Sequence, residues 1–401
     1  MAKLTRREFL LSLATVPFLR LAIPQVMGNI LTMPARQNQT GEPAGSGQPN
    51  ILFVLFDTFS AQHMSLFGYE RETTPNIARA IGQGGTVYHQ HYAGGNFTTP
   101  ATASLLTGLY PWTHRSLQSF GHVLERYSSH NLFQFVPDTY YKVAYTHNSL
   151  AAALLHLFQD SIDEYVPRRE LTRADGIVSD TLFARDYPVA IHAERLIQGA
   201  NINSSLTFFA AINKLHKLIV RENLEEEYRE LFPRGLPGGN FHALYLLEDA
   251  MDWIIQQSTT LPNPYMLYVH LLPPHAPYAP RADFVGAFDD NWHPPVKPET
   301  FDARGHTQES LDKQRRFYNE YIGYVDAEFG RLFDTLKSSG ALDNTYLVLT
   351  SDHGELFERG ILGHTTRTLY EGLTHIPLVI WKPGETTQMD VQQRTSCVDV
   401  V

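Results

Sequence analysis

The run Asn50-Ile51-Leu52-Phe53-Val54-Leu55-Phe56 is followed directly by Asp57, and this stretch decides the fold class. An apolar run without polar alternation is typical of a strand that is buried on both faces of a parallel sheet. Three further runs share the pattern, at residues 264–270, 346–350 and 376–381. Each of them is predicted to be a strand of the same sheet.

Helical patterns lie between these runs. The clearest covers residues 311–338, where apolar side chains recur near helical spacing. Strands that alternate with helices favour an α/β fold with a central, mostly parallel sheet that is flanked by helices on both faces.

Polar residues follow the predicted strands at one end of the sheet. Asp57, His275 and the pair Asp352-His353 all come after apolar runs, and ligands of open α/β sheets bind beyond the carboxyl ends of the strands. A buried carboxylate is unfavourable unless it is paired or bound to a cation. An aspartate beside a histidine supplies oxygen and nitrogen ligands for a divalent metal. The alternative is that Asp57 caps a turn or a helix.

Thr98-Thr99-Pro100 precedes a stretch rich in Ala, Ser and Leu that ends at Gly108. This pattern predicts a helix that starts near Thr98. A hydroxyl group at a helix N-terminus lies where the helix dipole favours negative charge, and a metal there would activate it as a nucleophile. The alternative is that Thr98 or Thr99 only caps the helix.

The chain contains 18 histidines. His147, His275 and His364 are candidates for the site, although a lone histidine is more often a structural residue. His270 is interpreted as structural.

Taken together, these segments resemble the sulfatase branch of the alkaline phosphatase superfamily. Their order and spacing agree from about residue 50 to residue 400. The matching segments are Phe53-Val-Leu-Phe-Asp57, Gly68-Tyr69, Thr74-Pro-Asn76, Thr98-Thr-Pro100, Leu105-Leu-Thr-Gly-Leu-Tyr-Pro111, Pro274-His-Ala-Pro-Tyr278, Tyr324-Val-Asp326, Gly330-Arg-Leu332, Asp343-Asn-Thr345, Ser351-Asp-His-Gly-Glu355, Gly363-His364, Leu369-Tyr-Glu371 and Ile376-Pro-Leu378.

The resemblance implies an alkaline-phosphatase-like α/β fold and a metal-dependent enzyme that acts on sulfate or phosphate esters. It implies that Asp57, Thr98, Asp352 and His353 bind one divalent metal ion, for which Mn²⁺, Zn²⁺, Mg²⁺ and Ca²⁺ are all suitable. Thr98 would also be the nucleophile.

The resemblance further implies roles for four residues outside the metal site. His275 and His364 would contact the ester oxyanion or protonate the leaving group. Arg367 would neutralise charge on the transferring group. His147 falls near a substrate histidine of the phosphoglycerol and phosphoethanolamine transferases, which belong to the same superfamily.

The sequence departs from the usual sulfatase pattern at the nucleophile. Sulfatases typically carry a formylglycine made from Cys or Ser in a Cys/Ser-x-Pro-x-Arg context, whereas this chain has Thr98-x-Pro100-x-Thr102. Its single cysteine, Cys397, lies far away in the sequence, so no formylglycine is expected. Thr58 replaces the second aspartate of the usual Asp-Asp pair. The set Asp57, Thr98, Asp352 and His353 instead resembles the site of the threonine-dependent transferases.

Three functions are compatible with these patterns. The leading hypothesis is a metal-dependent hydrolase of the sulfatase family that cleaves sulfate or phosphate esters through Thr98. The second is a transferase of the phosphoglycerol or phosphoethanolamine type. The third is a catalytically inactive binding protein with the same fold.

The two ends of the chain suggest how it is organised. Arg6-Arg7, followed by Phe9-Leu10 and a short apolar run, resembles a twin-arginine export signal or anchor over residues 1–28. Residues 29–48 are rich in Gly, Pro, Gln and Ser and predict a flexible linker. Residues 49–401 would form the catalytic domain, without the smaller C-terminal subdomain into which family members normally continue.

Composition narrows the range of partners. The chain carries 32 Lys and Arg against 42 Asp and Glu, which gives a net charge of −10 and makes nucleic acid a poor ligand. We expect an exported protein with an ester substrate, either free or linked to a glycan or lipid. The N-terminal segment would allow membrane association.

Overall fold

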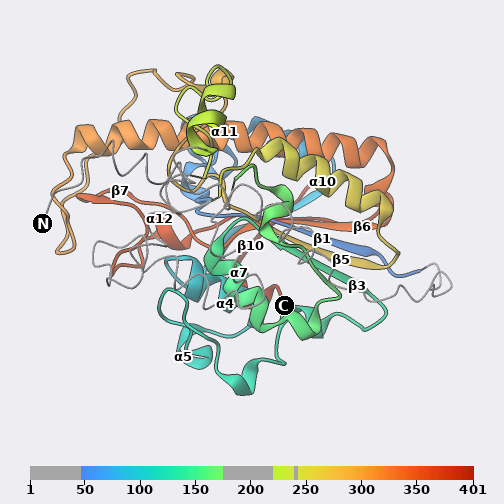
Figure 1. The fold of residues 1–401 in the computed structure, drawn as a ribbon. Helices are drawn as coiled ribbons and strands as arrows, with labels where there is room; N and C mark the ends of the chain where they lie inside the picture. Colours follow the sequence, from blue (N-terminus) through green and yellow to red (C-terminus); the bar gives the residue numbers. More distant parts are fainter. Residues whose placement is uncertain (1–46, 175–219, 239–242) are drawn as a thin grey trace, which may run out of the picture. The chain divides into compact units, whose positions relative to one another are not determined.

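The computed structural model describes residues 47–174, 220–238 and 243–401. Its centre is an eight-stranded sheet (Figure 1). The strands, in their order across the sheet, are β10 (Met389–Ser396), β2 (Gly85–Tyr92), β9 (Leu378–Trp381), β6 (Thr345–Ser351), β1 (Asn50–Phe56), β5 (Tyr265–Leu271), β3 (Tyr141–Thr146) and β4 (Glu164–Tyr165).

The sheet is mostly parallel. Strand β9 pairs antiparallel with both β2 and β6, and every other neighbouring pair is parallel. The four predicted strand runs correspond to β1, β5, β6 and β9. The last of these starts only at Leu378, because Pro377 has no N–H to donate to a ladder.

Helices cover both faces of the sheet (Figure 1). The face that packs against Leu52, Val54 and Phe56 of β1 carries α3 (Pro75–Ile81), α10 (Leu247–Thr260) and α11 (Gln308–Ser338). The face that packs against Phe53 and Leu55 carries α4 (Thr98–Thr107), α6 (Leu132–Phe135) and α7 (Ser149–Leu157), and α5 (Pro111–His114) lies beside α4. The predicted α/β class is therefore confirmed, and so is the burial of β1 on both faces.

The remaining elements are short. A two-stranded ribbon consists of β7 (Phe357–Glu358) and β8 (Ile361–Leu362), and α12 (Glu371–Thr374) follows it. Residues 220–227 are helical. Within the described ranges, the 3₁₀-helices are Ala61–His63, Ser65–Phe67, Glu125–Tyr127, Gln159–Ser161, Arg168–Leu171, Ala282–Phe284, Ala341–Asn344 and Cys397–Asp399.

Two predicted helices have clear boundaries. The helix predicted over 311–338 begins earlier, at Gln308, because the Thr307 hydroxyl accepts the backbone N–H of Ser310 at 3.2 Å and caps it. Helix α4 ends at Gly108, whose φ of 64° is a left-handed conformation that glycine adopts easily.

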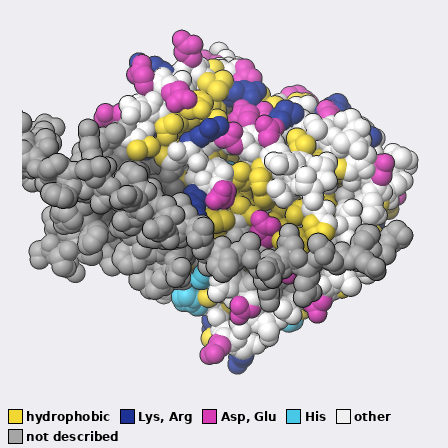
Figure 2. All heavy atoms as spheres, turned by 45° about the vertical axis from the view of Figure 1, so that its right-hand side comes forward, with side chains coloured by type: hydrophobic (Ala, Val, Ile, Leu, Met, Phe, Trp, Pro, Cys, Tyr) yellow, Lys and Arg dark blue, Asp and Glu magenta, His cyan; other side chains and the backbone are white. Residues whose placement is uncertain are grey.

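On the face shown in Figure 2, acidic and basic side chains are interspersed with apolar ones. Neither sign of charge therefore dominates the described part of that face. None of the helices in the described ranges combines the length and the apolar character needed to cross a membrane. The predicted signal and almost all of the predicted linker fall within residues 1–46, outside the described residues.

Candidate active site

Asp57 and Asp352 lie side by side at the carboxyl ends of β1 and β6. Phe56 pairs with Ser351 in the parallel register of these strands, so the residues that follow are neighbours. Both aspartates are buried. The sheet therefore brings together two carboxylates that are nearly 300 positions apart in the sequence.

The turn after β1 is strained. Thr58 has a φ of 58°, which is unusual for a β-branched residue. Its N–H donates to Asp352 Oδ1 at 3.3 Å, and its carbonyl accepts the hydroxyl of Tyr318. These bonds maintain the strained turn that places Asp57 beside Asp352.

Two imidazoles face the carboxylates. His353 Nδ1 lies 2.9 Å from the carbonyl of Gly354, which directs Nε2 toward Asp352 Oδ2 at 3.5 Å and Asp57 Oδ1 at 3.6 Å. His270 on β5 has its Nε2 at 3.5 Å from Asp57 Oδ2 and 3.8 Å from Asp352 Oδ2. The sequence analysis predicted a structural role for His270, but the pairing of β1 with β5 places this residue in the cluster.

The cluster has the donor atoms of a metal site. Ligand atoms of Asp57, His270 and Asp352 lie within 4.8 Å of one another. Within the described residues, Asp57 Oδ1 and both ring nitrogens of His270 are buried without a hydrogen-bond partner. Such orphaned groups are unfavourable unless a ligand satisfies them, and carboxylate oxygens with imidazole nitrogen fit a divalent cation.

Burial and neighbouring charged groups both shift the pKa values of the cluster. Burial raises the pKa of Asp352, and the charge of Asp57 raises it further. Burial also opposes ionisation of Asp57, but contacts with His270, His275 and His353 outweigh it and hold the pKa of Asp57 below its usual value. Burial lowers the pKa of His353, which favours the neutral imidazole that binds metals.

Thr98 is the first residue of α4 and points toward this cluster. The N-cap position belongs to Phe97, and no side chain caps the helix there. The Thr98 hydroxyl oxygen lies 3.4 Å from His353 Nε2 and accepts an N–H from Asn148 at 3.3 Å. One turn further along, the Thr102 hydroxyl lies 3.5 Å from Asp352 Oδ2. Neither Thr98 nor Thr99 is therefore the helix cap, which was the alternative to a catalytic role.

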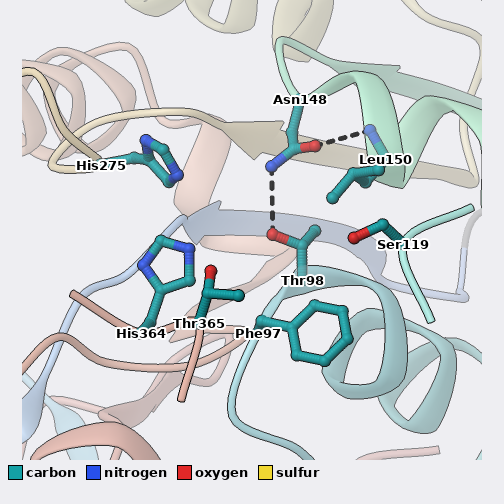
Figure 3. Close-up of a pocket in the computed structure, with 8 residues that line it drawn as sticks. All are labelled: Phe97, Thr98, Ser119, Asn148, Leu150, His275, His364 and Thr365. Carbon is teal, nitrogen blue, oxygen red and sulfur yellow. Dashed lines mark hydrogen bonds between the residues drawn. The ribbon is translucent and has the colours of Figure 1, made fainter. Parts of the chain in front are cut away.

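A cavity of about 240 Å³ opens over Thr98. Figure 3 shows His275 and His364 together on one side of the Thr98 hydroxyl, with Asn148 on another. The lining residues are Phe97, Thr98, Ser119, Asn148, Leu150, His275, His364 and Thr365.

The two cavity histidines are held by different contacts. His275 Nδ1 lies 2.6 Å from the carbonyl of Ala276, and the two imidazole centroids are 5.0 Å apart. His364 Nδ1 lies 3.0 Å from Glu355 Oε1, and Tyr278 donates to the other carboxylate oxygen at 3.3 Å. Burial lowers the pKa of His364, but the charge and hydrogen bond of Glu355, together with the charges of Asp57 and Asp352, outweigh burial and raise the pKa above the usual value.

His147 and Arg367 lie apart from the cavity wall. His147 is buried and stacks on Tyr245 with a centroid distance of 4.1 Å. Successive side chains leave an extended segment in opposite directions, and in the segment after β3 it is Asn148 that faces Thr98. The Arg367 side chain is exposed, and its backbone N–H donates to Asp302 at 2.9 Å. Neither residue is among those that line the cavity over Thr98, where the sequence predicted that both would contact the substrate.

Sequence reasoning missed three residues of this site: Asn148, His270 and Glu355. Asn148 had a usable signal, because asparagine before Ser149-Leu150 is a helix-capping pattern. Glu355 ends the motif Ser351-Asp-His-Gly-Glu355, but the motif alone indicates no role for it. His270 had no signal in the sequence, because only strand pairing places it beside Asp57.

The family model described as Sulfatase matches residues 49–401. The chain belongs to the sulfatase family. The resemblance that was inferred from the ordered motifs is therefore confirmed.

Curated relatives match this sulfatase-family chain at low identity. Human N-acetylgalactosamine-6-sulfatase is 22% identical over 370 residues, covering 87% of this chain and 60% of the relative. Choline-sulfatase of Rhizobium meliloti is 23% identical over 388 residues, covering 84% of this chain and 64% of the relative. The chain thus spans about six-tenths of the length of these relatives.

Solved structures share the fold. Phosphonate monoester hydrolase of Agrobacterium radiobacter superposes with a TM-score of 0.61 at 20% identity, covering 88% of this chain and 72% of that chain. The C-terminal periplasmic domain of EptC from Escherichia coli, in complex with Zn, superposes with a TM-score of 0.55 at 16% identity, covering 89% and 81%. These neighbours confirm the alkaline-phosphatase-like fold.

Proposed function

We propose that this sulfatase-family protein is a metal-dependent hydrolase of sulfate or phosphate esters in which Thr98 is the nucleophile. One observation carries the proposal. The Thr98 hydroxyl lies at the N-terminus of α4, within 3.4 Å of His353, and borders a cavity that two histidines share. A nucleophile, a metal-type donor cluster and proton donors therefore converge on one point.

Asp57, Asp352 and His353 would hold a divalent metal, with His270 as a further nitrogen donor. The bound cation would neutralise charge on the transferring group and favour ionisation of Thr98. The helix dipole of α4 acts in the same direction, because the positive end of the helix lies at Thr98.

Three side chains, those of Thr98, His364 and His275, would each perform a separate part of the reaction. Thr98 loses its hydroxyl proton to solvent, and its oxygen forms a bond to sulfur or phosphorus while the bond to the leaving oxygen breaks. His364, whose pKa Glu355 raises, gives its proton to the leaving oxygen, and His275 contacts the transferring group. Water then hydrolyses the ester on Thr98 and restores the hydroxyl.

The charge of the cavity favours a substrate with one negative charge at the reacting group. Its eight described lining residues include no Lys or Arg, and the two carboxylates would offset the charge of a divalent cation. A sulfate monoester or a phosphodiester carries a single charge, whereas a phosphate monoester carries up to two near neutral pH. The first two classes therefore fit this cavity better.

A transferase is the second candidate. Threonine at the nucleophile position, together with the Asp352-His353 pair, favours it over a formylglycine-type enzyme. An acceptor alcohol would then replace water in the second step. The proposed substrate, free or linked to a glycan or lipid, and the proposed export through Arg6-Arg7 are compatible with either reaction.

The test is a substrate panel on the purified chain. Aryl sulfate, aryl phosphodiester and aryl phosphate would each be supplied with Mn²⁺, Zn²⁺, Mg²⁺ or Ca²⁺, using wild type, Thr98→Ala and Asp352→Ala. We expect turnover of a singly charged ester and a loss of about 10³-fold or more in Thr98→Ala. Full activity of Thr98→Ala would reject the nucleophile, and preference for the aryl phosphate would reject the charge argument.

Two further outcomes separate the alternatives. Faster product release on addition of glycerol or ethanolamine, with transfer to that alcohol, would favour the transferase. Wild type that is indistinguishable from Asp352→Ala on every substrate would favour the inactive binding protein.

A further inference from the structure

Asn148 combines two tasks in one side chain. It is the N-cap of α7, where its Oδ1 accepts the backbone N–H groups of Leu150 at 2.7 Å and Ala151 at 3.3 Å. Because both acceptor sites face backbone donors, the amide oxygen is assigned without ambiguity. The Nδ2 group must therefore point away from α7.

The other end of the amide faces the site. Nδ2 donates one hydrogen bond to Asp57 Oδ2. It donates a second to the Thr98 hydroxyl at 3.3 Å, as Figure 3 shows. The side chain is 1% exposed. All four hydrogen-bonding positions of the amide are used, so rotation of the group would leave buried donors and acceptors unsatisfied.

We propose that Asn148 is a positioning residue. Its amide is anchored to the N-terminus of α7 and fixes the positions of the Asp57 carboxylate and the Thr98 hydroxyl relative to each other. This inference rests on the proposed function of Thr98. Donation to Thr98 holds the hydroxyl oxygen beside the donor cluster, 3.4 Å from His353 Nε2, and would leave the second lone pair of that oxygen for the cation. Donation to Asp57 fixes the carboxylate plane, so that Oδ1, the oxygen without a partner, faces the donor cluster.

A purely structural role makes a different prediction. Serine caps a helix about as well as asparagine does, so Asn148→Ser retains the α7 cap. It removes the amide that reaches Asp57 and Thr98. If Asn148 were only a cap, Asn148→Ser would have little effect on the site.

The chain provides a matched control. Asn131 caps α6 in the same way, accepting the N–H groups of Phe133 at 3.1 Å and Gln134 at 3.2 Å. Its Nδ2 donates to Ser128 and Ser161, which are not residues of the site. Asn131→Ser therefore repeats the cap exchange without touching Asp57 or Thr98.

The experiment compares wild type, Asn148→Ser and Asn131→Ser in the full chain. Thermal unfolding, Mn²⁺ affinity by calorimetric titration, and kcat and KM on the best ester of the panel are measured for each. We expect both variants to melt within a few degrees of each other. We expect Asn148→Ser alone to lose 10–100-fold in Mn²⁺ affinity and in kcat, with KM almost unchanged, because supporting partners of ligands typically have effects of this size.

Every outcome of this experiment either supports the role of Asn148 or overturns it. Mn²⁺ affinity and kcat of Asn148→Ser at wild-type levels, equal losses in Asn131→Ser, or a rise in KM alone would overturn it. If wild type binds Mn²⁺ but turns over no ester, the proposed function fails, and Mn²⁺ affinity still decides the role of Asn148. If wild type neither binds Mn²⁺ nor turns over an ester, there is nothing to position and the inference fails with the function.

Discussion

Glu355 shows how one buried carboxylate can orient a catalytic candidate. Its two oxygens contact His364 Nδ1 and the Tyr278 hydroxyl, and it is 1% exposed. A carboxylate that pairs with one ring nitrogen orients the imidazole and stabilises its protonated form. The other nitrogen, Nε2, is then available for proton transfer in the cavity.

Glu355→Gln should therefore slow substrates with poor leaving groups more than activated ones. Gln retains the approximate shape of the side chain but removes the negative charge, so the protonated form of His364 is less favoured. We expect about a 10²-fold loss of kcat/KM for an unactivated alkyl or phenyl ester, and a small loss for a p-nitrophenyl ester, whose leaving group needs no proton.

Glu371→Gln is the control for this change. Glu371 contacts Gln62 in an exposed position, and we expect unchanged kinetics with both leaving groups. Equal losses for the two esters in Glu355→Gln would argue against proton donation by His364.

At the scale of elements, a side chain of α11 caps the start of α3. Thr74 precedes α3 but makes no side-chain cap. Asp326 of α11 replaces that cap by accepting three hydrogen bonds, from Asn76 N at 2.9 Å, Asn76 Nδ2 at 2.8 Å and Ile77 N at 2.8 Å. The cap thus comes from a helix 250 residues away.

Asp326→Ala should destabilise the fold markedly. Asp326 is 1% exposed, and its loss would leave buried donors at the start of α3 without partners. We expect a decrease of about 2–3 kcal/mol in unfolding free energy, seen as a lower midpoint in urea.

Asp334→Ala is a control on the same two helices. Asp334 of α11 pairs with Arg79 of α3 at 2.8 Å, but both side chains are about half exposed. We expect a change of about 0–1 kcal/mol for this surface ion pair. Similar midpoints for the two variants would contradict the capping role of Asp326.

At the scale of the whole molecule, buried neutral histidines should make the fold sensitive to acid. Burial lowers the pKa of His63 and His91 to about 3, and that of His114 to about 4, from an ordinary value of 6.5. Between pH 6.5 and pH 4, the unfolded chain binds protons that the folded chain excludes. Stability is therefore complete above about pH 6.5 and falls as the pH decreases, by up to about 1.4 kcal/mol per pH unit for each histidine.

The measurement is the melting temperature between pH 4.5 and pH 7.5 in a chelating buffer, so that metal release does not contribute. We expect a smaller acid-induced decrease in His91→Gln than in wild type. His293→Gln should retain the wild-type slope, because the His293 side chain is 68% exposed. An identical slope in all three proteins would contradict this account.

The fold class follows from local patterns, which predicted β1, β5, β6 and β9 but not β2, β3, β4 or β10. The four apolar runs, the long amphipathic helix and the Thr-Thr-Pro start of α4 predicted the α/β class and the end of the sheet where the site lies. These features can be read locally because burial and helix periodicity leave a direct trace in residue order.

The sequence by itself determined the class of fold, the family and the candidates Asp57, Thr98, Asp352, His353, His275 and His364. Only the tertiary structure decided which neighbouring side chains contact and orient these candidates. His270 entered the site through strand pairing, Asn148 through the cap of α7, and Glu355 through its contact with His364. Tertiary structure also directed His147 onto Tyr245 and left Arg367 exposed. The physical reason is that side-chain direction and long-range pairing depend on packing, which residue order alone does not encode in a readable form.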